Sequence, residues 1–214
     1  MINKILILFM AIYINDGFCG VSVVGTRFML NDQMHHLNIK ITNDNESDYL
    51  IKSVLDDKDF IISPPLFLLP KNSSNLITVI PKEKTQYDKD NILNLTLTAI
   101  PRSTLNDDSN AVSLAVRNHF KVIYRHKDLQ DSAFNKLNIV YENNQCTLSN
   151  HSDFAFTVSL SKNKNDIQAK LMNLSPDEKI PLGNTNSVSD CESWVNFYNE
   201  YNDIIKTIKL TNKS

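Results

Sequence analysis

The chain has 214 residues, of which 42% are hydrophobic, and its formal net charge is −2. This near-neutral balance, without a basic run, argues against a nucleic-acid partner and against binding to a membrane surface. Only four glycines are present, which nearly excludes a glycine-rich phosphate-binding loop.

The first predicted element is a cleaved secretory signal over residues 1–19. Lys4 precedes an apolar run over residues 5–14, which is too short for a membrane-spanning helix of about 20 residues. The small residues Gly17 and Cys19 then occupy the positions that signal peptidase requires, so we expect cleavage after Cys19. We therefore expect a secreted protein without membrane insertion after signal cleavage; a signal anchor is the alternative.

Two cysteines remain after this cleavage, Cys146 and Cys191. In an oxidising compartment two cysteines most simply form one disulfide. Closing a loop of this length stabilises a fold by roughly 4 kcal/mol in the chain-entropy model. Two free buried thiols are the alternative.

Short β-type segments separated by turn residues make up the rest of the chain. In the first half, the expected strands are residues 21–30, 37–41, 49–55, 60–62, 66–69, 76–80, 92–100 and 111–124. In the second half, they are residues 137–141, 146–148, 154–160, 169–174, 193–198 and 204–210. A helix over residues 194–208 is the alternative there, and its Tyr, Asn and β-branched content weakens it.

Strand signals at nearly regular spacing, with no βαβ rhythm, favour an all-β protein built of β-sandwiches. The charged segment after residue 125 reads as a hinge. We expect an N-terminal immunoglobulin-like domain over residues 20–125, a hinge over 126–128 and a second immunoglobulin-like domain over 129–214.

No constellation of residues in the sequence indicates catalysis. The five histidines, none of which has metal-ligand spacing, are His35, His36, His119, His126 and His151. Cys146 and His151 resemble a nucleophile and base, but a disulfide-bonded cysteine is no nucleophile. We therefore expect neither an enzyme nor a metal or cofactor site.

Two cations interrupt otherwise apolar strand segments, Arg27 in the first and Lys121 in the eighth. A single such cation usually extends its head group to solvent. Two of them in separate strands, without carboxylates beside them in sequence, indicate an anion-binding cleft.

An ordered series of segments along nearly the whole chain carries a resemblance to a known family. The segments are Val21–Arg27, Thr42–Asn45, Ser63–Pro65, Ile100–Ser103, Lys121–Arg125, Asn150 and Leu174–Pro176. Together they resemble the usher-pathway periplasmic pilus (fimbrial) chaperone family. The resemblance implies two immunoglobulin-like β-sandwich domains at an angle, with a cleft between them, and allows one cis X-Pro bond in the Pro-Pro segment.

The resemblance also implies the roles of particular residues. Arg27 and Lys121 would bind the C-terminal carboxylate of a pilus subunit through charge-assisted hydrogen bonds. Val112, Leu114 and Val116 would form a donor strand that completes the subunit's fold. From periodicity alone, the same alternation also fits an ordinary half-buried strand.

A third implied feature is an interdomain ion network of Asp90, Arg125 and Glu200. The implied function is a periplasmic chaperone, without cofactor, that folds and caps pilus subunits by donor-strand complementation and delivers them to an outer-membrane usher. Self-association of the free protein is left open, as is the length class of the loop over residues 101–110. The alternative function is a secreted immunoglobulin-like pilus subunit or adhesin.

Overall fold

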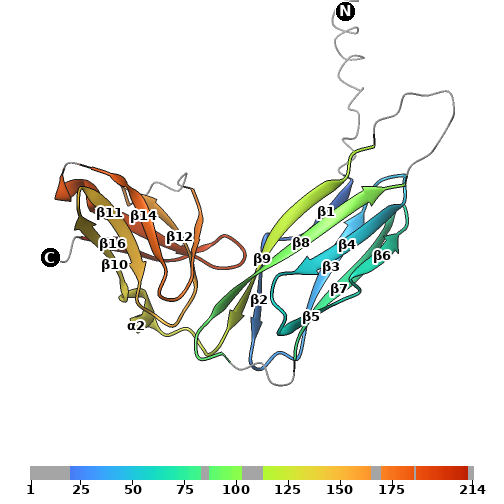
Figure 1. Ribbon diagram of the computed structural model, residues 1–214, viewed down its shortest axis with the longest axis horizontal. Helices are drawn as coiled ribbons and strands as arrows, with labels where there is room; N and C mark the ends of the chain where they lie inside the picture. The colour runs from blue at the N-terminus through green and yellow to red at the C-terminus, as the bar shows by residue number, and fades with distance from the viewer. Residues whose placement is uncertain (1–19, 83–86, 103–112, 165–169, 186, 212–214) are drawn as a thin grey trace, which may run out of the picture.

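The computed structural model describes residues 20–82, 87–102, 113–164, 170–185 and 187–211, and is built almost entirely of β-strands (Figure 1). The strands form two sandwich domains, as the sequence predicted, which diverge from their connection (Figure 1). The predicted signal, residues 1–19, lies outside the described residues and stays a prediction.

The N-terminal domain packs two sheets face to face. One has the strand order β1-β3-β7-β5 and the other the order β2-β9-β8-β4-β6. The strands are β1 (Val21–Val23), β2 (Arg27–Asn31), β3 (Leu37–Asn43), β4 (Tyr49–Leu55), β5 (Phe60–Ser63), β6 (Leu66–Leu69), β7 (Ser73–Pro81), β8 (Asn91–Pro101) and β9 (Val116–Arg125). The Ser63–Pro64 bond before β6 is cis.

Alternating apolar side chains of both sheets form the core of this domain. Ile39 and Ile77 come from the first sheet, and Leu93, Leu95 and Val122 from the second, and all are at most 1% exposed. Since side chains alternate between the two faces of a strand, the residues between them point away from the core. Burial of each such side chain contributes roughly 1.5 to 3 kcal/mol before the entropy cost.

The first predicted strand, residues 21–30, is split between the two sheets. β1 pairs antiparallel with β3, whereas β2 pairs parallel with β9 in the other sheet. Gly25 lies in the crossing at φ +100°, a conformation that side-chain-bearing residues rarely adopt. Because the chain leaves the second sheet at this point, β2 covers β9 only from Lys121 onward.

The C-terminal domain is a second, smaller sandwich. Its sheets have the orders β10-β11-β14 and β13-β12-β15-β16. The elements are α2 (Asp131–Phe134), β10 (Leu137–Glu142), β11 (Gln145–Asn150), β12 (Phe156–Ser161), β13 (Met172–Leu174), β14 (Lys179–Asn184), the 3-10 helix η1 (Val188–Cys191), β15 (Ser193–Tyr198) and β16 (Ile204–Leu210). Phe134, Phe156 and Phe197 contact one another at its centre.

The predicted disulfide is present, and it joins β11 to η1. The Cα atoms of Cys146 and Cys191 are 5.5 Å apart. Both residues belong to the buried core of the C-terminal domain. The bridge therefore ties the 3-10 helix to the three-stranded sheet.

Several predicted strands have the bounds that the sequence suggested, including β4, β6, β15 and β16. The helical alternative over residues 194–208 is wrong, because β15 and β16 form an antiparallel pair there. The sequence missed β14 and the short helix α2. Within the described ranges, no helix has the length and apolar character needed to span a bilayer.

Candidate functional site

Arg27 and Lys121 lie side by side on neighbouring strands. They are register partners in the parallel pair of β2 and β9, and the Lys121 backbone N–H donates to the Thr26 carbonyl at 3.1 Å. Their neighbours Phe28 and Phe120 point to the core side, so both cations project from the outer face of the sheet. The parallel register thus brings together two cations that are far apart in sequence.

Arg27 is a buried cation that reaches the C-terminal domain. Only 7% of the residue is exposed. Its Nη2 donates to the Asn199 carbonyl at 2.9 Å and to Oδ1 of Asn202, both in the loop between β15 and β16. Burial lowers the pKa of Arg27, and the nearby charge of Glu200 partly offsets this effect. Arginine nonetheless stays protonated in proteins.

Neither cation has an ion-pair partner among the residues that the structure describes. Lys121 is half-buried, and its Nζ donates to Oδ1 of Asn94 on β8. The Nε of Arg27 is buried without a hydrogen-bond partner there. Two adjacent positive charges that are satisfied only by neutral oxygens are suited to binding an anion such as a carboxylate.

The first half of β9 forms an open sheet edge that leads to this cation pair. Residues 116–120 pair with β8 on one side, whereas pairing with β2 begins only at Lys121. On the other side of residues 116–120, no strand in the described part of the chain forms a ladder. An edge of this kind presents unpaired backbone N–H and C=O groups that another chain can use.

The expected donor-strand residues lie at this edge or just before it. Val116 is the first residue of β9 and is 53% exposed; Leu114, which is 74% exposed, precedes the strand. Val116 pairs with Ala99, a core residue of β8, so it lies on the core-facing side of the sheet but beyond the core itself. Val112 lies outside the described residues.

Asp90 connects the two domains at the end of β9. Its fully buried carboxylate contacts Nη1 of Arg125 and accepts hydrogen bonds from the His126 backbone N–H at 3.0 Å and the Ala155 backbone N–H at 2.8 Å. Nδ1 of His126 lies 2.7 Å from the same carboxylate. The Asp90 N–H in turn donates to the Asp153 carbonyl at 2.8 Å. The contacts at Asp90 therefore bind β8, the end of β9 and the C-terminal domain together.

Glu200 lies near this network without an ion pair in the described structure. Its charge raises the pKa of Arg27 and of Arg125 against the larger, opposite effect of burial. The role of Glu200 in holding the domain angle stays a prediction. The sequence missed the contributions of His126, Ala155, Asn199 and Asn202, because backbone groups and loop amides leave no recognisable sequence signal.

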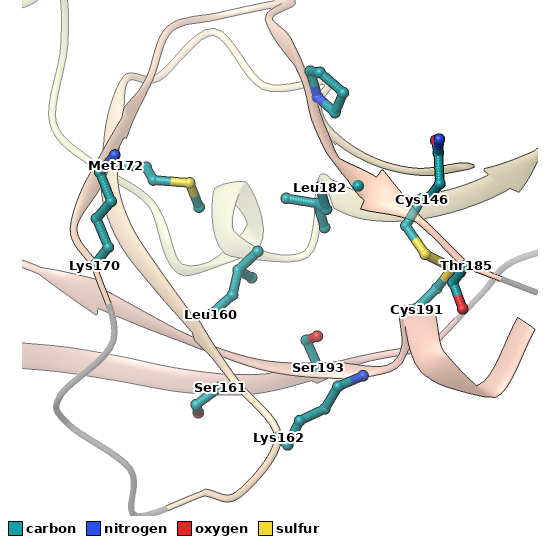
Figure 2. Close-up of a pocket in the computed structure, with 13 residues that line it drawn as sticks. Cys146, Leu160, Ser161, Lys162, Lys170, Met172, Leu182, Thr185, Cys191 and Ser193 are labelled. Carbon is teal, nitrogen blue, oxygen red and sulfur yellow. A yellow bond between two sulfur atoms is a disulfide. The ribbon is translucent and has the colours of Figure 1, made fainter. Parts of the chain in front are cut away.

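A cavity of about 620 Å³ lies in the C-terminal domain and not at the cation pair. Figure 2 shows Leu160, Met172 and Leu182 around its middle, with the Cys146–Cys191 disulfide at one side. Of the predicted site residues that the structure describes, only these two cysteines line it. Among the described residues, no group of three or more His, Cys, Asp or Glu side chains could hold a metal ion.

Many solved structures resemble the fold, and two of them serve as examples. The crystal structure of the periplasmic chaperone SfaE aligns with a TM-score of 0.69 and 21% identity over 90% of this chain and 100% of that chain. A chain of the Salmonella enterica SafA pilin–SafB chaperone complex aligns with a TM-score of 0.70 and 15% identity over 90% of this chain and 96% of that chain. At these identities the likeness concerns the fold.

Sequence comparison gives the family. The chaperone protein FocC of Escherichia coli is 25% identical over 210 residues, which cover 92% of each chain. Residues 20–130 match the family of pili and flagellar-assembly chaperones, PapD N-terminal domain. Since this match spans more than half of the 214 residues, the chain belongs to the family of pili and flagellar-assembly chaperones.

Proposed function

We propose that this protein is a periplasmic chaperone that lends a strand to pilus subunits and holds their C-terminal carboxylate. The observation that carries the proposal is the open edge of β9, residues 116–120, which ends at the paired cations Arg27 and Lys121. One half of this site supplies strand pairing, and the other supplies a charge anchor. The proposal needs no metal or nucleotide.

Strand pairing would complete an unfinished immunoglobulin-like subunit. A subunit that lacks its last strand has unpaired backbone groups and an open hydrophobic groove, and both cost free energy. The edge of β9 would supply ladder hydrogen bonds, and alternating side chains at positions 112, 114 and 116 would enter the groove. Each aliphatic side chain buried there contributes roughly 1.5 to 3 kcal/mol before ordering costs.

Binding of the C-terminal carboxylate at Arg27 and Lys121 would fix the direction of the subunit strand. A C-terminal carboxylate at Arg27 and Lys121 puts the end of the subunit strand at the end of the open edge. The subunit strand would then run the same way as β9, in line with β2, which already pairs parallel to β9. Guanidinium and ammonium groups form stronger hydrogen bonds to a carboxylate than to the neutral oxygens they contact in the free protein.

The comparisons and the sequence support this proposal from other directions. SafB is described as a chaperone in complex with the pilin SafA, and SfaE as a periplasmic chaperone. The predicted signal over residues 1–19 would direct this chain to the same compartment. Delivery to an outer-membrane usher, and capping of the edge by self-association in the free protein, are further parts of the proposal.

Replacement of the anchor lysine tests the proposal. The protein, or its Lys121→Ala variant, is co-expressed with candidate pilus subunits, and subunit recovery in a periplasmic pull-down is measured. Loss of a charge-assisted contact of roughly 1.5 to 3 kcal/mol should reduce the affinity by about ten- to a hundredfold. The melting temperature should stay within about 2 °C of wild type.

Lys52→Ala is the matched control, because Lys52 is an exposed lysine on the same face of the same sheet, on β4. It should recover the subunit as well as wild type does. Wild-type recovery by Lys121→Ala would contradict the anchoring role.

A further inference from the structure

A second cavity, of about 480 Å³, is lined by Arg27 and two further residues of the edge strand β2. Its walls come from both domains. They are Val24, Gly25, Arg27, Phe28, Met29, Met34, Leu37, Glu200 and Tyr201. The cavity is separate from the one in the C-terminal domain, with which it shares no lining residue.

Exposed apolar side chains gather at this cavity. Val24 is 87% exposed, Met34 36% and Tyr201 77%. They come from the crossing between β1 and β2, the loop between β2 and β3, and the loop between β15 and β16. Apolar side chains that are left exposed together at a hollow indicate a surface that a partner covers.

The polar part of the cavity is Arg27, together with Glu200. The Nε of Arg27 is buried without a hydrogen-bond partner in the described structure. Arg27 therefore lies beside Lys121 in the sheet and also lines the cavity. A ligand anchored at Arg27 by an anionic group would have the apolar walls within reach of its neighbouring atoms.

We propose that this cavity receives an apolar side chain close to the C-terminal carboxylate of the bound polypeptide. The inference rests on the proposed function, which ends the bound strand at Arg27. A strand in line with β2 would end beside Val24 and Gly25, which form the near wall of the cavity. The cavity thus selects polypeptides by the side chain next to their carboxylate.

Peptides test this selection without a known subunit. The probes are short fluorescein-labelled peptides of alternating Val and Thr that end in Phe, Leu, Ala or Asp, each as the free acid and as the amide. Fluorescence anisotropy measures their affinity for the full mature chain. Burial of a Phe or Leu side chain should make those free acids bind about tenfold more tightly than the Ala peptide. The amides should all bind more weakly than the acids.

The variant Met34→Ser removes an apolar wall from a loop position. It should reduce the preference for Phe over Ala from about tenfold to about twofold. Leu66→Ser is the matched control, because Leu66 is 55% exposed on β6 and does not line the cavity. It should keep the wild-type preference.

The outcomes separate this inference from the proposed function. If the acids bind more tightly than the amides but the last residue has no effect, the cavity inference fails and the anchor stands. If Met34→Ser keeps the full preference, the selection arises elsewhere and the cavity inference fails. If acids and amides bind equally, or if no free acid binds, the anchor fails and the cavity inference fails with it.

Discussion

The two halves of β9 share one alternating pattern and have opposite surroundings. In the second half, Val122 and Tyr124 are at most 2% exposed and belong to the core. Val116, on the same face of the same strand, is 53% exposed. The second half has strands on both sides, whereas the described structure gives the first half only β8.

The difference between the halves comes from their neighbours and not from their own residues. β2 joins the sheet at Lys121, after Gly25 has carried the chain across from the other sheet. Towards the start of β9 the core-facing side of the strand leaves the domain's own core, because Phe120 still belongs to that core whereas Val116 is 53% exposed. Hydrophobic alternation therefore identifies a strand but does not show whether its apolar face serves its own domain or another protein.

The largest expected effect is the difference in unfolding free energy between an Asp substitution at Val122 and one at Leu114. Val122→Asp would place an unpaired carboxylate at a position that is 0% exposed and should destabilise the protein by about 3 to 5 kcal/mol. Leu114→Asp, at a position that is 74% exposed, should change stability by less than about 0.5 kcal/mol. Urea unfolding measures both.

Leu114→Asp should affect subunit binding much more than it affects stability. Leu114→Asp should strongly reduce subunit recovery although the protein stays folded, because a charge cannot enter an apolar groove without cost. If Leu114→Asp lost stability and subunit binding to the same extent, the segment that leads into β9 would be an ordinary core segment.

A smaller effect is expected at the end of the second half, where Asp90 contacts Arg125 and His126. Asp90→Asn removes the only ion-pair partner of Arg125 in the described structure and should cost about 3 kcal/mol. Asp153→Asn is the matched control, because its side chain is 38% exposed and its ion pairs with Lys89 and Lys127 lie at the surface. It should cost less than about 1 kcal/mol.

Small-angle scattering of the Asp90→Asn variant would measure whether the angle between the two domains changes. Loss of the contacts between Asp90 and the C-terminal domain should widen the distribution of domain angles while each sandwich stays folded. Equal stability of Asp90→Asn and Asp153→Asn would show that Asp90 does not hold the domains together.

The smallest effect is expected from alkaline pH, which acts on the second half through Tyr124 and its neighbour Tyr87. Burial, together with a hydrogen bond to Asp57, raises the pKa of Tyr87 to about 12, and burial also raises the pKa of Tyr124. In the unfolded chain these phenols lose their protons near pH 10, at about their ordinary pKa. The folded state then holds more protons than the unfolded state, so stability should fall as the pH rises from about 10 towards 12.

Thermal unfolding over this pH range measures the slope. Tyr87→Phe removes one of the two shifted phenols and should make the slope shallower. A slope as steep as that of wild type would show that Tyr87 does not contribute to it.

The sequence predicted the architecture well, because the strands depend on local alternation and turn residues. The bounds of β4 and β16 follow directly from such patterns. The split between β1 and β2 could not be read in the same way, because Gly25 is a single permissive residue inside an otherwise continuous strand-like stretch.

The candidate site was predictable only where it consists of unusual side chains. Arg27 and Lys121 stood out as cations within apolar strands, and the structure makes them register partners. The contacts of Arg27 with Asn199 and Asn202 depend on how the two domains are placed, which no local pattern records. The contact between Asp90 and the Ala155 backbone also depends on the placement of the two domains, so the sequence did not predict it.

The junction of the open edge with the cation pair has one further consequence under the proposed function. If the C-terminal carboxylate of the subunit is held at a fixed point, the number of residues from that end sets the position of each subunit residue along β9. Adding one residue to the subunit's C-terminus would then move every earlier residue by one position and turn its inward side chains outward. The chaperone would in this way discriminate against a subunit whose C-terminus is one residue too short or too long.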